Sequence, residues 1–462
     1  MKKVTFIQMI LLLGLSISSS QVFAQTEQAH KSTNKLETEK TSQATKQIPS
    51  LSTDVWQDEW ANDWQETTEL SPWKFGYFAE VAYGRFMQNN VVESNTSLSE
   101  LRGRVNVDYS HELFEFTAKG DLLFDEVLQQ TDVNTKELNI AFSPLNNLDV
   151  KLGRQVLTWG TGDYVFLNDL FNKDWQSFFS GRDDEYLKSA SDSVRMTSYW
   201  RDFTLDLAWT PDFSPDNYLT GERFSFYSPI LKRNIAPNEN FIVEQTQDSQ
   251  WSARLATSIQ GVEYALYGYK GFWTTPLGIN HQGMAYFPKM NAWGASALTP
   301  LSNGIFNVEF SIYNSLEDSQ GNQAAIPNSQ VRALMGYEQE IVKNLTVGLQ
   351  YYLEKTQQYD AFIQSTLFQS TLFANEQVDE YRQLATVRLR YSTLQQKLVY
   401  SLFAFYSPTD QDSYLKPAIH YRYNDNYSFS AGANIFSGSK PYTFFGQHQA
   451  NTNVWFRGRF SF

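Results

Sequence analysis

The densest set of charged side chains lies in and around the segment 159–190, where large aromatic residues alternate with acids and bases. Charged side chains that line an aqueous passage set its ion selectivity. Side chains as large as Trp and Phe need an apolar surface to pack against. We therefore expect this segment to fold inward and narrow a lumen. The candidate constriction residues are Arg154, Asp163, Asp169, Asp174, Arg182, Asp183, Asp184, Glu185, Lys188, Asp192 and Arg195.

The same charges have a second interpretation. Arg–carboxylate pairs would tie the segment to a wall without selecting any solute, and the two roles are compatible. Arg154 is a special case, because simple alternation would point it outward. A β-bulge at Gly153 would turn it inward, and we expect such a bulge.

Other chemistries find little support in the residues. The chain has five His and no Cys, and no His pair lies at metal-ligand spacing. No His lies in a recognisable hydrolase motif, and no phosphate-binding glycine loop is present. The net charge of -13 disfavours nucleic-acid binding. We therefore predict neither an enzyme nor a metal or cofactor site.

The elements that must position these charges are strands, because apolar and polar residues alternate with a period of two from Trp73 onward. The expected neighbours are 73–88 with 97–110, 112–126 with 134–144, 148–158 with 191–201, 202–210 with 249–260, 261–272 with 286–299, 303–314 with 328–341, 343–355 with 379–393, 396–407 with 413–424, and 426–437 with 449–462. Short turns alternate with long connections along this series, which is typical of a transmembrane antiparallel β-barrel of about 18 strands with both ends in the periplasm.

Alternation also assigns a face to each side chain. A charge facing lipid at mid-depth costs about 2–4 kcal/mol, so charged positions should face the lumen. Barrels of this strand number leave an aqueous interior. The expected lumen-wall residues are Arg102, Arg104, Arg388 and Arg390.

The two ends of the chain predict the compartment. Residues 1–24 have a basic start, a short apolar run and a Val-Phe-Ala ending, which indicates a cleaved signal peptide. The last strand ends on Gly458, Phe460 and Phe462, alternating with charged residues. This ending resembles the signal by which the outer-membrane assembly machinery recognises its clients. The expected location is the outer membrane of a Gram-negative bacterium, in contact with its lipid, and the 16% aromatic content would supply interfacial girdles.

Residues 25–72 precede the expected barrel, and their first half is polar enough to form a flexible periplasmic tail. Further along, Trp56, Trp60 and Trp64 recur every four residues, which places them on one face of a short helix. This helix would pack against the barrel rim or the membrane interface. The alternative is a plug, or a docking site for a periplasmic partner.

One motif resembles a known family. Gly153-Arg154-Gln155, Trp159-Gly160 and Asp163, followed by Asp192 and Arg195 on the returning strand, resemble the alginate-export type of outer-membrane barrel. The resemblance covers about fifty residues. It implies that Arg154 and Arg195 lie near a constriction with Asp163 and Asp192 as partners. Acids among the wall arginines distinguish this chain from a pore for polyuronates.

These features favour a porin-like outer-membrane channel for a small or amphiphilic solute. A substrate-specific exporter, or a lipid-transport partner of an inner-membrane system, is the first alternative. A surface receptor or adhesin acting through the long loops 211–248 and 356–378 is an alternative of another class.

Overall fold

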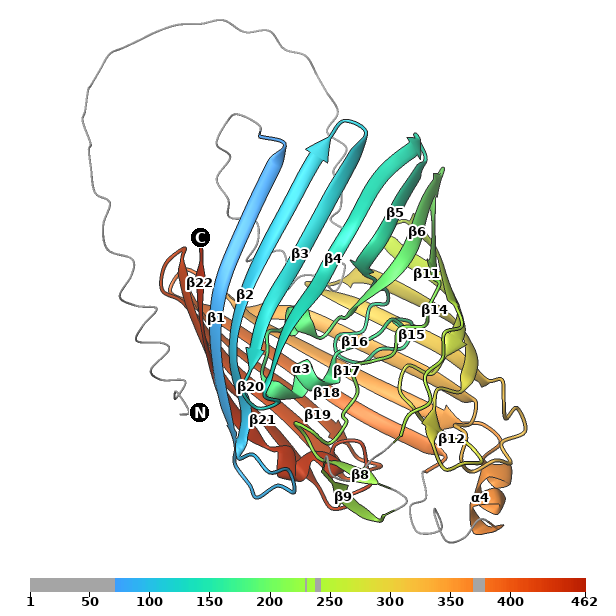
Figure 1. The fold of residues 1–462 in the computed structure, drawn as a ribbon. Helices are drawn as coiled ribbons and strands as arrows, with labels where there is room; N and C mark the ends of the chain where they lie inside the picture. Colours follow the sequence, from blue (N-terminus) through green and yellow to red (C-terminus); the bar gives the residue numbers. More distant parts are fainter. Residues whose placement is uncertain (1–70, 229–230, 237–241, 369–378) are drawn as a thin grey trace, which may run out of the picture. The chain divides into compact units, whose positions relative to one another are not determined.

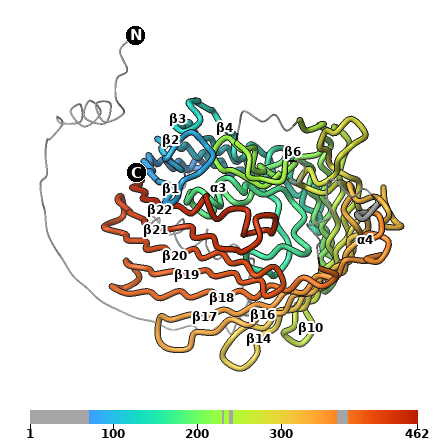
Figure 2. The backbone as a smooth tube through the Cα atoms, turned by 90° about the horizontal axis from the view of Figure 1, so that it is seen from below, coloured from blue at the N-terminus to red at the C-terminus, as the bar shows by residue number. Residues whose placement is uncertain are grey.

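The wall of the molecule is one closed sheet. The computed structural model describes residues 71–228, 231–236, 242–368 and 379–462. Within these residues, 18 strands form a single antiparallel sheet, and the first, β1 (Trp73–Phe86), also pairs with the last, β22 (Asn453–Ser461). Figures 1 and 2 show the resulting barrel from the side and from one end. Closure leaves no unpaired strand edge, as a lipid environment requires.

Every wall strand pairs with its neighbours in chain order. Between β1 and β22 these strands are β2 (Thr96–His111), β3 (Phe114–Asp125), β4 (Gln130–Leu145), β5 (Leu148–Val156), β6 (Ala190–Trp200), β7 (Phe203–Thr210), β10 (Gln250–Ile259), β11 (Val262–Phe272), β14 (Lys289–Leu301), β15 (Gly304–Ser315), β16 (Gln330–Val342), β17 (Leu345–Thr356), β18 (Tyr381–Thr393), β19 (Leu398–Ser407), β20 (Asp412–Arg422) and β21 (Tyr427–Gly438).

Smaller elements belong to the long connections. They are α3 (Trp175–Ser180), the 3-10 helix η1 (Asp184–Tyr186), the hairpin of β8 (Phe226–Ser228) and β9 (Arg233–Ile235), the hairpin of β12 (Gly278–Ile279) and β13 (Ala285–Tyr286), α4 (Tyr359–Phe368) and the 3-10 helix η2 (Gly446–Asn451).

The expected 18-stranded antiparallel barrel is confirmed, and each predicted strand overlaps an observed one. Boundaries differ mainly at the ends that carry long loops. The last strand, for example, begins at Asn453 because the preceding residues 446–451 form η2. Such local helical turns leave no mark on a period-two pattern.

The two ends of the barrel differ. Short turns join β2 to β3, β4 to β5 and β6 to β7 at one end, and both termini of the wall lie there. At this end Phe462 N donates to Tyr77 O over 3.1 Å. The opposite end carries α4 and the two small hairpins (Figure 1).

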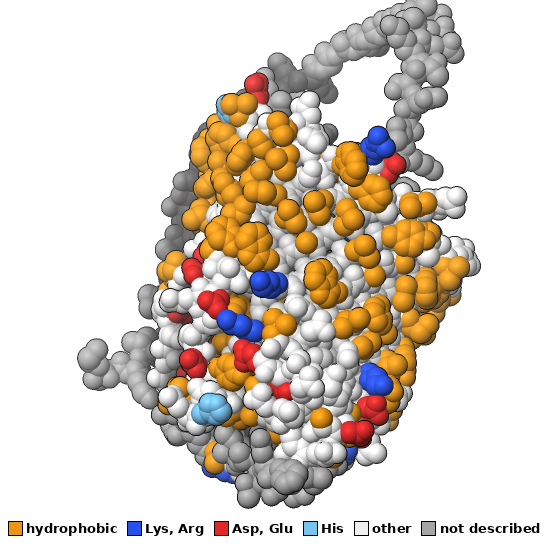
Figure 3. Space-filling view, turned by 90° about the vertical axis from the view of Figure 1, so that its right-hand side faces the viewer, with side chains coloured by type: hydrophobic (Ala, Val, Ile, Leu, Met, Phe, Trp, Pro, Cys, Tyr) orange, Lys and Arg blue, Asp and Glu red, His pale blue; other side chains and the backbone are white. Residues whose placement is uncertain are grey.

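The outer surface of the wall is apolar. On β7, Phe203, Leu205 and Leu207 are each about 40% exposed, whereas Asp206 between them is 2% exposed. Figure 3 shows hydrophobic side chains over most of one face, with charged ones mainly in its lower half, toward the long-loop end. Exposed aromatic residues mark the short-turn end, as in an interfacial girdle. They include Trp73, Tyr199, Trp200, Tyr391, Tyr423, Tyr427 and Phe462.

The predicted signal segment 1–24, the tail up to residue 70 and its Trp56, Trp60 and Trp64 lie outside the described residues. None of the helices in the described part of the chain is long and apolar enough to cross a membrane.

Candidate functional site

The connection between β5 and β6, residues 157–189, is here called the inner segment. It carries α3, which lies inside the ring of strands in Figure 2. Asp174 caps α3 by accepting a hydrogen bond from Ser177 N over 2.7 Å. The helix ends at Gly181, which has a φ of 88° and lies so close to the Trp455 ring that a Cβ would overlap it. Glycine therefore lets the inner segment approach β22.

Aromatic contacts attach the inner segment to the lumen face of the wall. Phe178 and Phe179 are 4% and 3% exposed. The ring of Phe178 lies 5.7 Å from that of Tyr414, and the ring of Phe179 lies 5.3 Å from that of Phe436. Tyr164 packs edge-on against Phe403 at 4.7 Å. These contacts explain why a connecting segment carries so many large apolar side chains.

A buried carboxylate holds the start of the inner segment. Glu309 of β15 accepts hydrogen bonds from Gly162 N and Asn168 Nδ2, each over 2.7 Å, and also from Thr161 N. Burial raises the cost of leaving any of these donors unpaired. Glu309 was not among the predicted residues, although its place between the outward-facing Val308 and Phe310 assigns it to the lumen face.

A second attachment, here called the anchor cluster, joins the inner segment to β2 and β3. Arg182 Nε lies 3.0 Å from Glu100 Oε1, and Arg104 Nη1 lies 2.6 Å from Glu185 Oε1. Arg223, from the connection after β7, approaches the same Glu100 at 3.3 Å. Most of these groups are buried. The members are Glu100, Arg102, Arg104, Asp121, Asp125, Arg182, Glu185 and Arg223.

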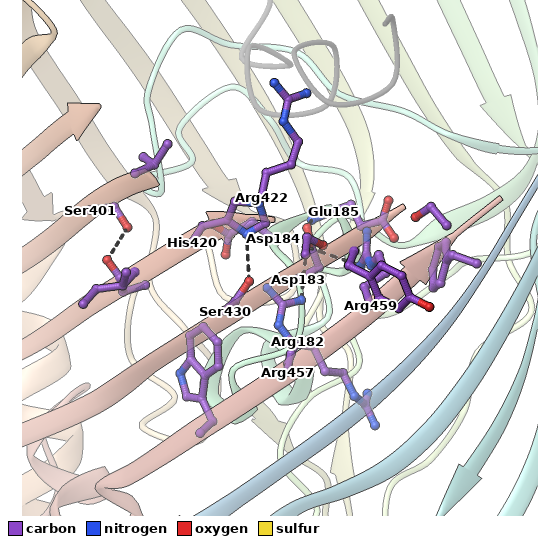
Figure 4. Close-up of a pocket in the computed structure, with 18 of the residues that line it drawn as sticks. Arg182, Asp183, Asp184, Glu185, Ser401, His420, Arg422, Ser430, Arg457 and Arg459 are labelled. Atoms are coloured by element: carbon purple, nitrogen blue, oxygen red, sulfur yellow. Dashed lines mark hydrogen bonds and ion pairs between the residues drawn. The ribbon is translucent and has the colours of Figure 1, made fainter. Parts of the chain in front are cut away.

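A cavity of about 550 Å³, here called the vestibule, opens beside the inner segment (Figure 4). It is on the short-turn side, because the turn residues Asn424, Asp425 and Asn426 line it. Nine Lys and Arg residues line it, against four Asp and Glu residues. The nine are Arg104, Lys119, Arg182, Arg388, Arg390, Lys416, Arg422, Arg457 and Arg459; the four are Asp183, Asp184, Glu185 and Asp425.

The acids of the inner segment meet the bases of the wall. Asp183 Oδ2 lies 3.1 Å from Arg457 Nη1 and 3.4 Å from Arg459 Nη2. Asp184 pairs with Lys416 and accepts a hydrogen bond of 2.7 Å from the hydroxyl of Tyr164. The two adjacent acids therefore pair with different strands, Asp183 with β22 and Asp184 with β20. Figure 4 shows Asp183 beside Arg457 and Arg459.

Asp163 also pairs with the wall, at 3.2 Å from Arg388, but its electrostatic surroundings differ from those of Asp183. Burial would raise the pKa of Asp183, yet Arg457 and Arg459 outweigh it and hold that pKa below its usual range. Burial raises the pKa of Asp163 above its ordinary value, and the acids Glu338 and Asp184 add to the rise against Arg388. The two carboxyl groups therefore respond differently to acidification.

Four other predicted residues make contacts within the inner segment or within the wall, and they do not line the vestibule. Asp169 pairs with Lys173 at 2.8 Å, and both are buried. Asp174 is the N-cap residue of α3, and Lys188 forms an isolated antiparallel β-bridge with Lys173. Arg195 lies 2.8 Å from Asp206 on the lumen face of β6 and β7.

The predicted inward turn of Arg154 is wrong. Arg154 pairs with Asp192 at 2.7 Å, and the two side chains are 41% and 64% exposed. Directly across the sheet from Arg154 lies Leu138, which faces outward, and the register passes through Gly153 without a shift. With no bulge, alternation continues and both charges point to the outer face. They belong to no constriction.

Several lining residues were missing from the predicted set. Lys416, Arg422, Arg457 and Arg459 lie on wall strands, so the alternation that placed Arg388 and Arg390 in the lumen would have found them. Arg223 of the anchor cluster, which does not line the vestibule, was also missing, because it lies in an irregular connection where no periodicity assigns a face. Within the described residues, no group of three or more His, Asp or Glu could hold a metal ion.

No protein-family model and no curated protein matches the sequence. Solved structures match the fold. OccAB3 of Acinetobacter baumannii aligns with a TM-score of 0.52 at 11% identity, over 85% of this chain and 100% of that one. OccD3 (OpdP) of Pseudomonas aeruginosa aligns at 0.50 and 12% identity, over 85% of this chain and 92% of that one.

At such low sequence identity, the structural similarity shows the fold alone. The resemblance to alginate-export barrels stays a prediction from the motif. The alignments agree with the closed antiparallel barrel of 18 strands described above. The chain therefore has the fold of a closed antiparallel β-barrel, similar to that of these solved structures.

Proposed function

We propose that this protein is a channel that passes a small solute across the outer membrane, with the inner segment as its constriction. The observation that carries the proposal is a lumen that holds a charged vestibule of about 550 Å³ beside a segment packed across its interior. If the inner segment only filled the interior of the barrel, no solvent-accessible space lined by charges would be needed beside it. Cavities of this size accommodate small molecules.

The lining charge supports a preference for anions. Nine cationic side chains against four acids border the space that a solute would enter. Several of the cations are paired with acids of the inner segment, so the local field depends on how that segment is held. The constriction and the selectivity are therefore parts of one arrangement.

Planar-bilayer recordings of the purified protein test the proposal. We expect discrete current steps, with larger steps in a variant that lacks residues 174–181. Because that deletion could prevent folding, Phe178→Ala provides a milder loosening of the inner segment, and Phe203→Ala on the outer wall is its control. Absence of current steps from every folded variant would overturn the channel function.

A further inference from the structure

We propose that the outer face of the wall carries a binding site for a phosphorylated glycolipid of the outer leaflet, centred on Lys270 of β11. The site rests on the outer-membrane setting of the proposed function, but not on conduction. Lys270 is exposed and lies directly opposite Trp251, whose exposed fraction of 53% places both side chains on the lipid-facing surface. Among the described residues, no Asp or Glu lies within ion-pair distance of Lys270. Its counter-charge must therefore come from outside the chain.

Other lysines of the outer face do have partners within the chain. Lys289 Nζ lies 3.1 Å from Asp248 Oδ2, and Lys355 Nζ lies 3.3 Å from Glu380 Oε1. A charge on the lipid face is costly at mid-depth and is tolerated near the two interfaces. The unpaired ammonium of Lys270 thus marks a point where an external anion can bind.

This ammonium belongs to a row of side chains that crosses five strands, because directly opposite residues of an antiparallel sheet share a face. Lys270 lies between Trp251 of β10 and Asn291 of β14. The row continues to Trp209 of β7 and to Asn314 of β15. The Trp209 and Trp251 rings are 5.7 Å apart, and Asn314 Nδ2 donates to Asn291 Oδ1 over 2.8 Å. Indoles therefore flank the ammonium on one side and amides on the other.

A third indole lies beside the same ammonium. Trp293 is 61% exposed and lies directly opposite Gly268, two residues before Lys270. A Cβ at position 268 would come within 3.0 Å of the Trp293 ring, so the glycine lets the indole lie across β11. The complete set is here called the outer-wall site. Its members are Trp209, Trp251, Lys270, Asn291, Trp293 and Asn314.

The height of the outer-wall site identifies the lipid layer that it meets. Lys270 is the ninth residue of β11, which begins at Val262 beside a short turn, so it lies about 27 Å along the strand. Strands of such barrels tilt by about 35–45°, which places Lys270 about 20 Å above the short turns, near the far edge of an apolar band about 25 Å tall. Tryptophan is enriched at this boundary, where the headgroups lie. With the short turns in the periplasm, these headgroups belong to the outer leaflet.

The side chains of the outer-wall site fit the head of a phosphorylated glycolipid. Lys270 would pair with a phosphate, as basic side chains do near anionic headgroups. Asn291 uses its Oδ1 to accept from Asn314, while its Nδ2 group can donate to a phosphate or sugar oxygen. The indoles present apolar faces to sugar rings and acyl chains. A phospholipid with a small head would use the ammonium and leave the amides without a partner.

Binding of purified lipopolysaccharide to the full-length protein in detergent tests the site, with native mass spectrometry as the readout. Lys270→Gln should raise the Kd by about tenfold or more, because it removes a charge-assisted hydrogen bond. Lys270→Arg keeps the charge and should retain binding. The matched control is Lys289→Gln, which removes a nearby outward lysine whose charge is already paired with Asp248. Equal effects of Lys270→Gln and Lys289→Gln would overturn the site.

Variation of the lipid tests the assigned ligand. Removal of the phosphates from lipopolysaccharide should weaken its binding to the unmodified protein as much as Lys270→Gln does, and should not weaken binding to that variant further. Phosphatidylglycerol in the same detergent should compete poorly, and equal competition would overturn the assignment to a glycolipid. A dimer that forms without lipid and is lost in Lys270→Gln would show that a second copy covers this face, and would overturn the site.

The same variants separate the outer-wall site from the channel function. Lys270→Gln should leave the bilayer current unchanged, because the residue lies outside the lumen. Loss of lysine-dependent binding in a conducting protein would overturn the site and leave the channel function standing. Selective binding by a folded protein that never conducts would overturn the channel function and leave the site standing.

Discussion

Two regions of the lumen contain inward-facing arginines at alternate positions of a wall strand, yet they differ in what the arginines contact. In the anchor cluster, Arg102 of β2 meets Glu100 of its own strand and Asp121 of β3, so its carboxylate partners belong to the wall itself. Arg104 is intermediate, because it meets Asp121 of the wall and Glu185 of the inner segment and also borders the cavity. On the vestibule wall, Arg388 and Arg457 meet acids from the inner segment and also border the cavity.

The difference teaches that residue type and strand face do not by themselves define a pore residue. An acid on the adjacent strand leaves an arginine buried and structural. An acid supplied by a separate segment leaves the arginine at the boundary of the aqueous space. Substitutions in the two regions should therefore change different measurements.

The largest effect is expected in the anchor cluster. Glu100→Gln removes the carboxylate that faces Arg182 and Arg223. Breaking a buried ion pair by removing one partner costs about 3–5 kcal/mol, because the remaining charge loses its compensation. Urea unfolding in detergent micelles, followed by tryptophan fluorescence, measures the loss. A change below about 1 kcal/mol would show that the cluster does not hold the inner segment.

The next largest effect concerns selectivity. Arg388→Gln removes one positive charge from the vestibule lining and should shift the channel toward cations. A unit charge at 4 Å contributes about 1 kcal/mol in water, or about fivefold in a permeability ratio. Reversal potentials in a salt gradient measure the shift. Lys270→Gln on the outer wall is the control, and an equal shift there would contradict the assignment of Arg388 to the pore.

A smaller effect is expected from acidification. Since the pKa of Asp163 is raised, Asp163 takes up a proton as the pH falls from 7 toward its ordinary titration range, and Arg388 loses one compensating charge. Anion preference should therefore increase at mildly acidic pH, and Asp163→Asn should remove this change. By linkage the raised pKa favours the folded state as pH falls.

For Asp183, the change of folding stability with pH has the opposite sign. Its lowered pKa keeps it ionised, so its contribution is present above the pKa of the unfolded chain and is lost only in stronger acid. Asp183→Asn should thus leave the mildly acidic change in reversal potential intact. If it abolished that change, Asp163 would not be the titrating group.

The smallest effect is expected for the outward pair. The double variant Arg154→Gln and Asp192→Asn removes both charges together and leaves neither unpaired. Exposed ion pairs contribute about 0–1 kcal/mol, so stability should change little and reversal potentials should not change. A selectivity change as large as that of Arg388→Gln would place the pair in the conduction path after all.

The alternation of the sequence predicted the strands well because it is a local property. On the last strand, Val454 and Phe456 are exposed while Trp455 and Arg457 are buried, as the pattern indicates. The failure at Arg154 has the same origin. The bulge was expected because it would keep a charge from the outer face, whereas Asp192 directly opposite supplies a partner for Arg154 without one.

Contacts of the inner segment were beyond a local pattern. Nothing in the residues around Glu100 indicates that Arg182 and Arg223 meet there, because both come from irregular connections much later in the chain. The aromatic residues predicted that the segment needs an apolar surface, but not that this surface would be Tyr414 and Phe436.

The sequence by itself determined the barrel, its strand number, the side on which its ends lie and the face of most wall residues, because each follows from a period of two and the lengths of the turns. Only the tertiary structure decided which charges meet in the lumen. Those pairs depend on ring closure, register and the path of a segment without periodicity, and these bring together residues that are remote in the chain.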